Sequence, residues 1–412
     1  MNKLRGSIPN SVFKLVNLGY FYLSSNNLSG VLETSNFGKL RNLTWLDFSN
    51  YIGIWTWNMG KDILYSLNLS SNLISGFEML PWKNIQILDL HSNLSSHNKL
   101  SGEISSLICK ASSMGILDLS NNNLSGMLPH CLGNFSKDFF VLNLRRNQFY
   151  GTVPQTSLKG NAIRNIDFND NKLEGLISNT FSHWLETLPK LQVLVLCSNS
   201  FHGQIGFSKI KSPFMSLRII DFAHNDFEGD LPKMYLKSLK VTMNVYEGNM
   251  TRKYTGEYYY QDFVMVTIKG LEIEFVKILN TFTKIYLSSN KFQGEIPKSI
   301  GNLNSPRGLN LSHNNIVGHI PVFREFQFES FQNNLTRIIP RGNQFETFGN
   351  DSYDGNSGLY GFPLSKKCIV DETLELSKEA YAEYGCGLVI GLSLECLVFL
   401  SGKSKWLTMM VK

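Results

Sequence analysis

Apolar and polar residues recur along most of this chain in one short pattern, which returns mostly every 24 to 28 residues. Each copy follows the template LxxLxLxxNxLxG, in which the leucine positions accept other large apolar residues. Clear copies begin at Leu18, Leu64, Met114, Phe139, Ile163, Leu191, Leu217, Phe282 and Pro306. A fixed period of this length indicates a repeat protein whose turns stack into a solenoid.

The LxL core of each copy predicts a short strand, because alternate residues of a strand point to opposite faces. Strands of successive copies then form a parallel sheet on the concave side. The recurrent asparagine turns the chain out of the strand, and its buried amide can bond the backbone of neighbouring turns. In several copies an apolar residue and a proline follow the glycine. Proline keeps its predecessor extended, so we expect an extended or 3-10 convex side.

The regular spacing is interrupted between Asn225 and Asn290, which are 65 residues apart. The excess predicts a non-repeat island at residues 233–270. Long loops without repeat character are functional or disordered, and tyrosine is enriched at protein interfaces. Three consecutive tyrosines of the island are therefore candidates for contact with a partner, and packing within the protein is the alternative: Tyr258, Tyr259 and Tyr260.

Residues 384–402 form an apolar run with a single ionisable side chain, Glu395. About 20 apolar residues cross a bilayer as a helix, and a carboxylate at its midplane costs roughly 2.5–3.5 kcal/mol. We predict a transmembrane helix here, with a buried core helix as the alternative; the role of Glu395 stays open. Acidic residues precede the run, whereas Lys403 and Lys405 follow it, which places the repeats outside the cell.

The order of these segments resembles plant leucine-rich-repeat receptor-like proteins, the kinase-less relatives of receptor kinases. The resemblance is carried by the LxGxIP repeats, the island with "VTIKG", the segment "GNQFETFGNDSYDGNSGLYGFPLSKKC", the acidic stretch, the predicted span and the short basic tail. It implies a single-pass type I protein of the plasma membrane that recognises an extracellular peptide, protein or glycan, often in plant defence. It also implies signalling through an adaptor receptor kinase that binds the transmembrane and juxtamembrane regions, where Gly387 and Gly391 form a motif for close helix association.

The expected fold class is a leucine-rich-repeat solenoid with an island insertion, followed by one transmembrane helix. The expected division is repeats at 1–232, island at 233–270, repeats at 271–340, cap-like segment at 341–368, acidic juxtamembrane segment at 369–383, transmembrane helix at 384–402 and cytoplasmic tail at 403–412.

Three features depart from the family pattern. The chain begins in the middle of a repeat without a signal peptide or a polar cap, so we expect an N-terminal truncation. Some repeats are eroded, and Arg337 stands where the template has glycine. Tyr360 replaces the cysteine of the family's cap motif, which leaves Cys368 without its expected partner. Cys109 and Cys131, one repeat apart, are a candidate disulfide in an oxidising compartment.

Composition and motifs exclude several other functions. Only 17% of residues are charged and the net charge of +6 is spread along the chain, so no dense basic patch indicates nucleic-acid binding. No motif of a nucleotide-binding loop, metalloprotease, kinase or serine hydrolase occurs, the eight histidines lack metal-ligand spacing, and we predict no enzyme activity, metal or cofactor. Ten glycosylation sequons weakly favour secretion: Asn27, Asn42, Asn68, Asn93, Asn123, Asn134, Asn249, Asn310, Asn334 and Asn350.

Charged residues at the concave positions of neighbouring repeats are candidates for ligand binding, because concave solenoid faces are customary binding surfaces. These candidates are Arg145, Arg146, Asp167, Asp170, Asp221 and His224. Cross-strand salt bridges between arginine and aspartate are the structural alternative. Two other interpretations of the whole chain stay open: an extracellular inhibitor of a microbial enzyme, and a non-functional fragment of a longer receptor.

Overall fold

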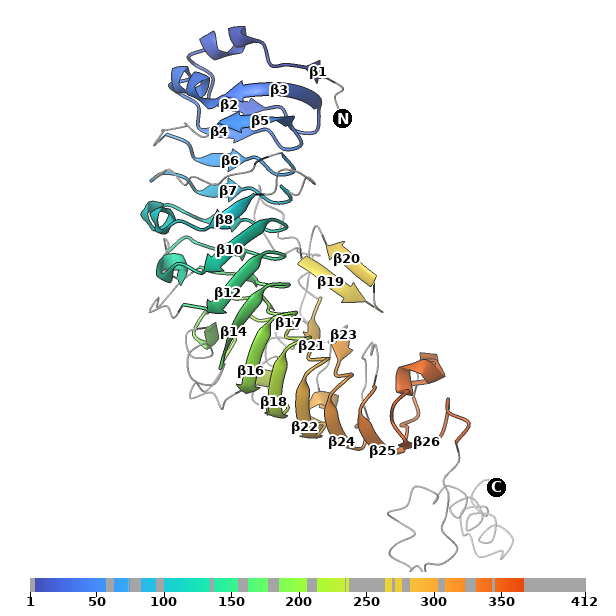
Figure 1. Cartoon of the computed structure of the whole chain (residues 1–412). Helices are drawn as coiled ribbons and strands as arrows, with labels where there is room; N and C mark the ends of the chain where they lie inside the picture. The colour runs from blue at the N-terminus through green and yellow to red at the C-terminus, as the bar shows by residue number, and fades with distance from the viewer. Residues whose placement is uncertain are drawn as a thin grey trace, which may run out of the picture.

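The computed structural model is a curved solenoid in which two long sheets run side by side along the stack (Figure 1). The structure describes residues 4–56, 63–72, 74, 83–93, 100–133, 137–154, 162–176, 185–205, 213–233, 235–236, 264–268, 271–275, 282–302, 308–322, 331–342 and 345–366. Most turns contribute one strand to an inner sheet, which ends at β23, and from β8 onward one strand to a lateral sheet, which continues to β26.

The inner sheet confirms the predicted parallel sheet of LxL strands. It contains 11 parallel three-residue strands among the described residues. These strands are β2 (Tyr20–Tyr22), β4 (Trp45–Asp47), β6 (Ser66–Asn68), β7 (Ile87–Asp89), β9 (Ile116–Asp118), β11 (Val141–Asn143), β13 (Asn165–Asp167), β15 (Val193–Val195), β17 (Ile219–Asp221), β21 (Lys284–Tyr286) and β23 (Gly308–Asn310). The central residue of each strand points into the core, so the first and third residues are available on the inner face.

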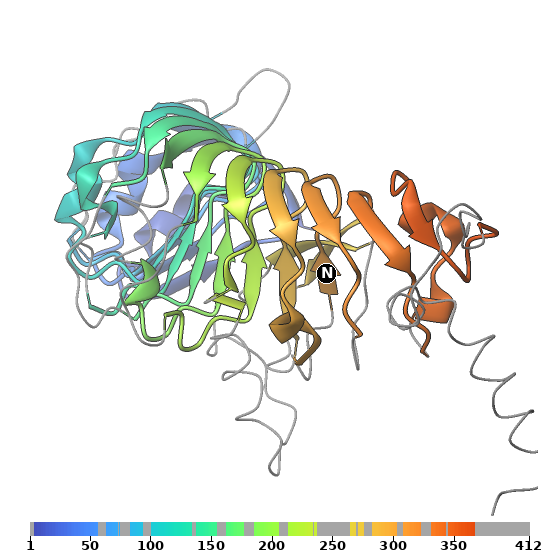
Figure 2. The ribbon, with the colours of Figure 1, turned by 90° about the horizontal axis from the view of Figure 1, so that it is seen from below.

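The lateral sheet is formed by the NxLxG part of the template, for which no strand was predicted; the predicted extended character concerned the segment after the glycine. Its strands are β8 (Ser101–Glu103), β10 (Asn123–Met127), β12 (Gln148–Thr152), β14 (Lys172–Leu176), β16 (Ser200–Gln204), β18 (Asp226–Asp230), β22 (Lys291–Glu295), β24 (Asn315–Gly318), β25 (Asn334–Ile338) and β26 (Gly358–Tyr360). Figure 2 shows these strands, from green to orange, following one another along the curve. A separate three-stranded sheet, β1 (Arg5–Gly6), β3 (Asn27–Glu33) and β5 (Ile52–Thr56), precedes them.

In several turns a short 3-10 helix follows the strand of the lateral or the three-stranded sheet and precedes the inner strand of the next turn. The proline-containing tails predicted an extended or 3-10 segment at this place. These helices are η1 (Asn10–Lys14), η2 (Thr34–Lys39), η3 (Ser106–Lys110), η4 (His130–Gly133) and η6 (Lys298–Asn302), and η7 (Phe345–Thr347) and η8 (Asn350–Tyr353) follow near the cap-like segment. The side chain of Ser105 caps η3 by accepting a hydrogen bond from the Leu107 N–H at 3.2 Å. Cys109 of η3 and Cys131 of η4 form the disulfide that the sequence predicted.

The core is one continuous apolar cluster that runs through the stack from Phe13 to Leu359. A column of asparagines satisfies the backbone along it. Asn147, for example, donates from Nδ2 to the carbonyls of Leu119 and Leu144 at 2.9 and 3.1 Å, and its Oδ1 accepts from the Leu124 N–H at 3.0 Å. These bonds link consecutive turns, so the predicted role of the recurrent asparagine is confirmed.

Glycine is required in the lateral sheet for its backbone conformation and, at some positions, for space. Gly203 of β16 has φ of 81°, and a Cβ there would lie 2.4 Å from Cδ2 of Leu176 on the neighbouring strand. Arg337 of β25, where the template has glycine, has φ of 78°. This arginine therefore occupies a conformation that costs little only for glycine.

The described part of the island is an antiparallel hairpin of β19 (Val264–Ile268) and β20 (Leu271–Phe275). The hairpin pairs with neither long sheet. Tyr258, Tyr259 and Tyr260 lie outside the described residues.

The predicted transmembrane segment 384–402, with Gly387 and Gly391, also lies outside the described residues, as do Asn134, Asn249 and Cys368. Within the part of the chain that the structure describes, no helix has the length and apolarity needed to cross a membrane.

Candidate ligand-binding surface

The third residue of most inner strands is aspartate or asparagine, and its side chain holds the turn that follows. One side-chain oxygen accepts a hydrogen bond from the backbone N–H two residues later. The donor–acceptor distances are 3.0 Å for Asp47, 2.9 Å for Asn68, 3.2 Å for Asp89, 2.9 Å for Asp118, 3.2 Å for Asn143, 2.9 Å for Asp167, 3.2 Å for Asp221 and 3.0 Å for Asn310. These Asx turns give the residues a structural role that aspartate and asparagine fill equally. Only the second side-chain oxygen, which does not accept the hydrogen bond of the turn, is left to contact a ligand.

Three of the predicted ligand-binding residues are buried on the inner sheet. Arg145, Asp167 and Asp221 each expose less than 5% of their surface. Burial raises the pKa of the Asp167 carboxyl to about 6, against the lowering effect of the Arg145 guanidinium. The prediction that these side chains form an open binding surface is therefore wrong, because an external ligand would not reach them in this arrangement.

Asp221 forms a buried ion pair with a residue that the sequence analysis missed. Nζ of Lys284 lies 3.2 Å from Oδ2 of Asp221, and both side chains are almost fully buried. The same ammonium lies 3.4 Å from the centre of the Tyr286 ring, so it also makes a cation–π contact. Lys284 is the first residue of its LxL strand, an outward position, and this position was the sequence signal that could have identified it. The pair is a cross-strand salt bridge, because Asp221 and Tyr286 are register partners on neighbouring strands.

The other three candidates lie on the turns that follow the inner strands and are exposed. Arg146, Asp170 and His224 have φ values of 51°, 56° and 53°, a conformation repeated once per turn along the solenoid. Nε of Arg146 lies 3.8 Å from Oδ2 of Asp170, so the salt bridge expected as an alternative is present at the surface. Exposed pairs of this kind contribute little to stability, and these side chains remain accessible to a ligand.

Between the Arg145 and Asp167 side chains and the Asp221–Lys284 ion pair, the inner face is apolar. Val193, Val195 and Ile219 form a small buried cluster, against which Cys197 packs. Burial, with Asp221 and Asp167 nearby, raises the pKa of the Cys197 thiol well above its usual range. A thiol in that state is protonated at neutral pH, which disfavours a nucleophilic or metal-binding role.

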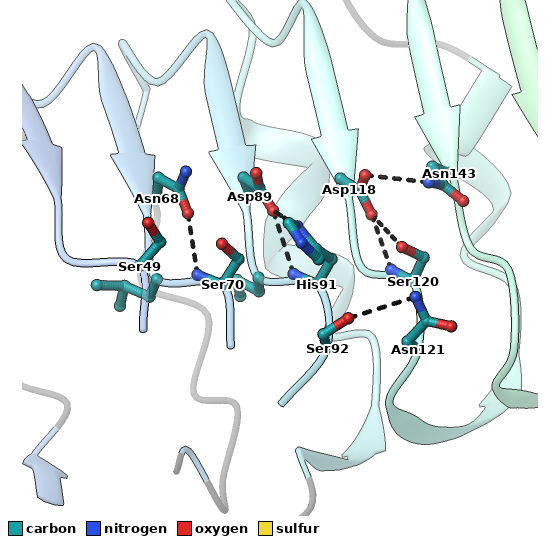
Figure 3. A network of polar contacts seen from close by, with 12 residues as sticks. Ser49, Asn68, Ser70, Asp89, His91, Ser92, Asp118, Ser120, Asn121 and Asn143 are labelled. Atoms are coloured by element: carbon teal, nitrogen blue, oxygen red, sulfur yellow. Dashed lines mark hydrogen bonds and ion pairs between the residues drawn. The ribbon is translucent and has the colours of Figure 1, made fainter. Parts of the chain in front are cut away.

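A polar network on neighbouring turns contains the group of described residues best able to hold a metal ion (Figure 3). One ligand atom each from Asp89, His91 and Asp118 lies within 4.8 Å of the others. Nδ1 of His91 is 2.6 Å from Oδ1 of Asp89, while Asp118 accepts hydrogen bonds from Ser120 Oγ at 2.7 Å and Asn143 Nδ2 at 3.0 Å. These contacts already occupy much of the donor set, so we assign it a structural role between turns.

A row of aromatic side chains lies on the inner sheet and was not among the residues predicted from the sequence. Tyr20 and Tyr22 of β2 are 62% and 52% exposed. The Trp45 ring stacks between those of Tyr20 and Tyr65, with centroid distances of 6.2 and 5.1 Å. The outward positions of the LxL strands predict this placement, but the candidates on the concave face were charged residues alone. This row is the most exposed part of the described inner face.

The sequons differ in their accessibility. Asn93 has no exposed surface, and its amide nitrogen donates to the Leu90 and Leu69 carbonyls at 2.7 and 3.3 Å. A glycan there is incompatible with the core, so this glycosylation candidate is wrong. Asn68 and Asn310 are half-buried. The exposed candidates are Asn27, Asn42, Asn123, Asn334 and Asn350.

Comparison with known proteins supports the repeat assignment. The family model Leucine Rich Repeat matches residues 114–135 and 281–303. Receptor-like protein 53 of Arabidopsis thaliana is 36% identical over 301 residues, which cover 66% of this chain and 30% of the relative. Receptor-like protein 32 of the same plant is 37% identical over 295 residues, covering 63% and 33%. The chain thus spans about a third of the length of the curated relatives it matches.

Solved structures share the same fold. The crystal structure of PEPR1–AtPEP1 has a TM-score of 0.62 and 26% identity, and the match covers 82% of this chain and 42% of that one. The plant peptide hormone receptor RGFR1 in complex with RGF2 has a TM-score of 0.58 and 22% identity, covering 87% and 58%.

Proposed function

Because its repeats and relatives identify the chain as a plant leucine-rich-repeat receptor-like protein, we propose that it recognises an extracellular ligand and signals through a partner receptor kinase in plant defence. The observation that carries this proposal is the 36% identity to Receptor-like protein 53 over 301 residues. The function is recognition, and no bond is made or broken.

The similar solved structures and the form of the inner sheet favour a peptide or protein as the ligand. Solved structures with this fold include a plant peptide hormone receptor in complex with RGF2 and the receptor kinase HAESA with the peptide hormone IDA and the co-receptor SERK1. The inner sheet extends over 11 strands along the stack, and such an elongated surface suits an extended chain. We propose that Arg146, Asp170 and His224 contact the ligand at the rim, together with Tyr258, Tyr259 and Tyr260 of the island.

The membrane part of the proposal rests on the sequence. Residues 384–402 have the length of a transmembrane helix, and the lysines that follow support a topology with the repeats outside the cell. We propose that the signal passes through a partner receptor kinase, as the resemblance to kinase-less receptor-like proteins implies. We propose that Gly387 and Gly391 let the partner's helix approach closely.

Co-purification tests the signalling proposal. The tagged chain is expressed in plant cells and isolated in mild detergent, and bound receptor kinases are identified by mass spectrometry. The proposal predicts that an adaptor receptor kinase is recovered with the parent chain and that recovery falls strongly for Gly387→Leu and Gly391→Leu. A matched Leu392→Ile variant in the same segment should retain the kinase. Failure to recover any kinase with the parent chain contradicts the proposal.

A fractionation experiment tests the membrane topology separately. A carbonate-resistant protein whose mobility shifts after glycosidase treatment supports a spanning segment with lumenal repeats. A soluble, unglycosylated product contradicts this topology.

A further inference from the structure

The inner face at β2, β4 and β6 carries an aromatic strip, which we define as Tyr20, Tyr22, Trp45 and Tyr65. Tyr20 and Trp45 are register partners on adjacent strands, and Tyr22 pairs in the same way with Asp47. The rings of Tyr20 and Tyr22 are 6.3 Å apart, and Trp45 stacks on Tyr20 and Tyr65. The strip is therefore continuous across three turns.

The strip is not needed to fill the core. Phe21 and Leu46, the central residues of the same strands, already pack in the apolar cluster. At the equivalent outward position the next strand has Ser66, so the solenoid geometry does not demand an aromatic residue there. Large aromatic side chains that are more than half exposed, as Tyr20 and Tyr22 are, mark interaction surfaces.

The charge around the strip has one sign. Within β2, β4, β6, β7 and β9 and the three residues after each strand, the ionisable side chains other than tyrosine are Asp47, Asp89, Asp118 and His91, and no lysine or arginine occurs. Asp47, beside the strip, is half-buried. Its Oδ1 accepts from Ser49 N–H at 3.0 Å, and no hydrogen bond to its second oxygen is found within the described residues. That oxygen is free to bind a cation of a ligand.

From β11 onward the inner face changes. Arg145 and Lys284 bring positive charge, but both are buried and lie close to the carboxylates of Asp167 and Asp221. Asp170 is exposed on a later turn, but its carboxylate lies 3.8 Å from the Arg146 guanidinium. At the strip, a half-buried carboxylate with no lysine or arginine on its own or the adjacent inner strands coincides with accessible aromatic rings.

From this coincidence we propose that the aromatic strip and Asp47 bind a cationic peptide segment in an extended conformation. The ring edges and faces make apolar and cation–π contacts, and Asp47 pairs with a lysine or arginine. This inference rests on the proposed function, for which it supplies a ligand chemistry and a location.

The probe is a fluorescein-labelled octapeptide of alternating arginine and proline, whose prolines keep it extended. Its binding to the full chain in detergent is measured by fluorescence anisotropy at two salt concentrations. The matching peptide of alternating glutamate and proline tests the sign of the charge, and unlabelled cellohexaose tests a glycan as competitor. The proposal predicts that only the arginine peptide binds, and more weakly at high salt.

Two substitutions separate the contributions. Trp45→Ala should weaken binding about tenfold, because one buried aromatic contact carries about that factor. Asp47→Asn should weaken it about threefold and reduce the salt dependence. Asparagine keeps the turn, as Asn68 and Asn143 show, so the loss reports the charge. Tyr150→Ala is the matched control, since Tyr150 is 49% exposed but lies on the lateral sheet.

Circular dichroism and the urea midpoint of each variant verify folding. Equal affinity of the parent and Trp45→Ala, equal binding of the glutamate peptide, or displacement by cellohexaose overturns the inference. These outcomes are distinct from a failure of the proposed function. If a receptor kinase still co-purifies while the arginine peptide does not bind, only the ligand chemistry is wrong.

Discussion

The inner and lateral sheets are made from the same repeats, yet they depend on opposite kinds of residue. In the inner sheet, outward positions range from Trp45 to Lys284, and an aspartate or asparagine side chain holds most of the turns. In the lateral sheet, outward side chains are exposed and a glycine with positive φ recurs from strand to strand. The inner sheet can therefore vary its chemistry freely, whereas the lateral sheet is restricted by its backbone. Recognition is expected where variation is tolerated.

Breaking the buried ion pair of the inner sheet should have the largest effect. Asp221→Asn keeps the turn but leaves the Lys284 ammonium buried without a carboxylate, and we expect the free energy of unfolding to fall by about 3 kcal/mol. Urea unfolding followed by circular dichroism measures this change. The double variant Asp221→Asn with Lys284→Met should recover most of the loss, because it removes the unpaired charge. An unchanged midpoint for Asp221→Asn would show that the pair is not buried in solution.

Asp167 should respond in the opposite direction and with a pH dependence. Burial raises the pKa of the folded Asp167 carboxyl to about 6, above its ordinary value of 3.8, so ionised Asp167 destabilises the fold. This penalty is absent below about pH 4 and grows as the pH rises through 6. Asp167→Asn should therefore raise the free energy of unfolding by about 1–2 kcal/mol at pH 7.5 and change it little at pH 4. A gain that is equal at both pH values contradicts this assignment.

Alanine substitutions at two glycines of the lateral sheet distinguish the need for space from the need for a positive φ. A Cβ on Gly358 would lie 2.5 Å from Cγ2 of Thr336 and 3.1 Å from the Leu335 carbonyl, whereas Gly102 has open space but φ of 103°. Gly358→Ala should cost about 1–2 kcal/mol through overpacking, and Gly102→Ala about 1 kcal/mol through backbone strain. Both are measured as shifts of the urea midpoint.

Thr336→Ser supplies the control for that pair. Serine keeps the hydroxyl that donates to the Gly318 carbonyl at 3.3 Å but removes Cγ2. It should reduce the cost of Gly358→Ala and leave the cost of Gly102→Ala unchanged. Equal relief of both would mean that space is not the distinguishing factor.

Arg337→Gly should have the smallest effect, and it should increase the free energy of unfolding instead of lowering it. The φ of 78° at Arg337 is the conformation that glycine adopts elsewhere in the lateral sheet. Arg337→Gly should raise the free energy of unfolding by about 0.5–1 kcal/mol, because relief of the strain exceeds the added entropy of the unfolded chain. Thr336→Gly on the same strand should lower it. A loss of stability in Arg337→Gly would indicate that the arginine side chain compensates for the strain.

Alternation and periodicity predicted the elements that depend on one repeat at a time. The LxL strands, the turn asparagines and the Cys109–Cys131 bridge follow from spacing, and the 3-10 segments follow from the prolines after the glycine. The lateral sheet was missed because a short NxLxG segment has strand partners only in the assembled stack. The burial of Arg145, Asp167 and Asp221 was missed for a related reason, since alternation assigns a side chain to a face but does not tell how much of that face is covered.

The asparagine column sets how the protein can change its length over evolution. Asn290 accepts from the Phe227 N–H at 3.1 Å and donates to the Phe222 carbonyl at 2.9 Å, although the island lies between them in sequence. The bonds around Asn147, with no insertion nearby, have the same pattern. The column therefore fixes the position of each turn relative to the next, whatever the number of residues between them. An insertion is neutral to the scaffold if it returns the chain to the next asparagine, so whole modules can be gained, lost or lengthened while the scaffold on either side stays in phase.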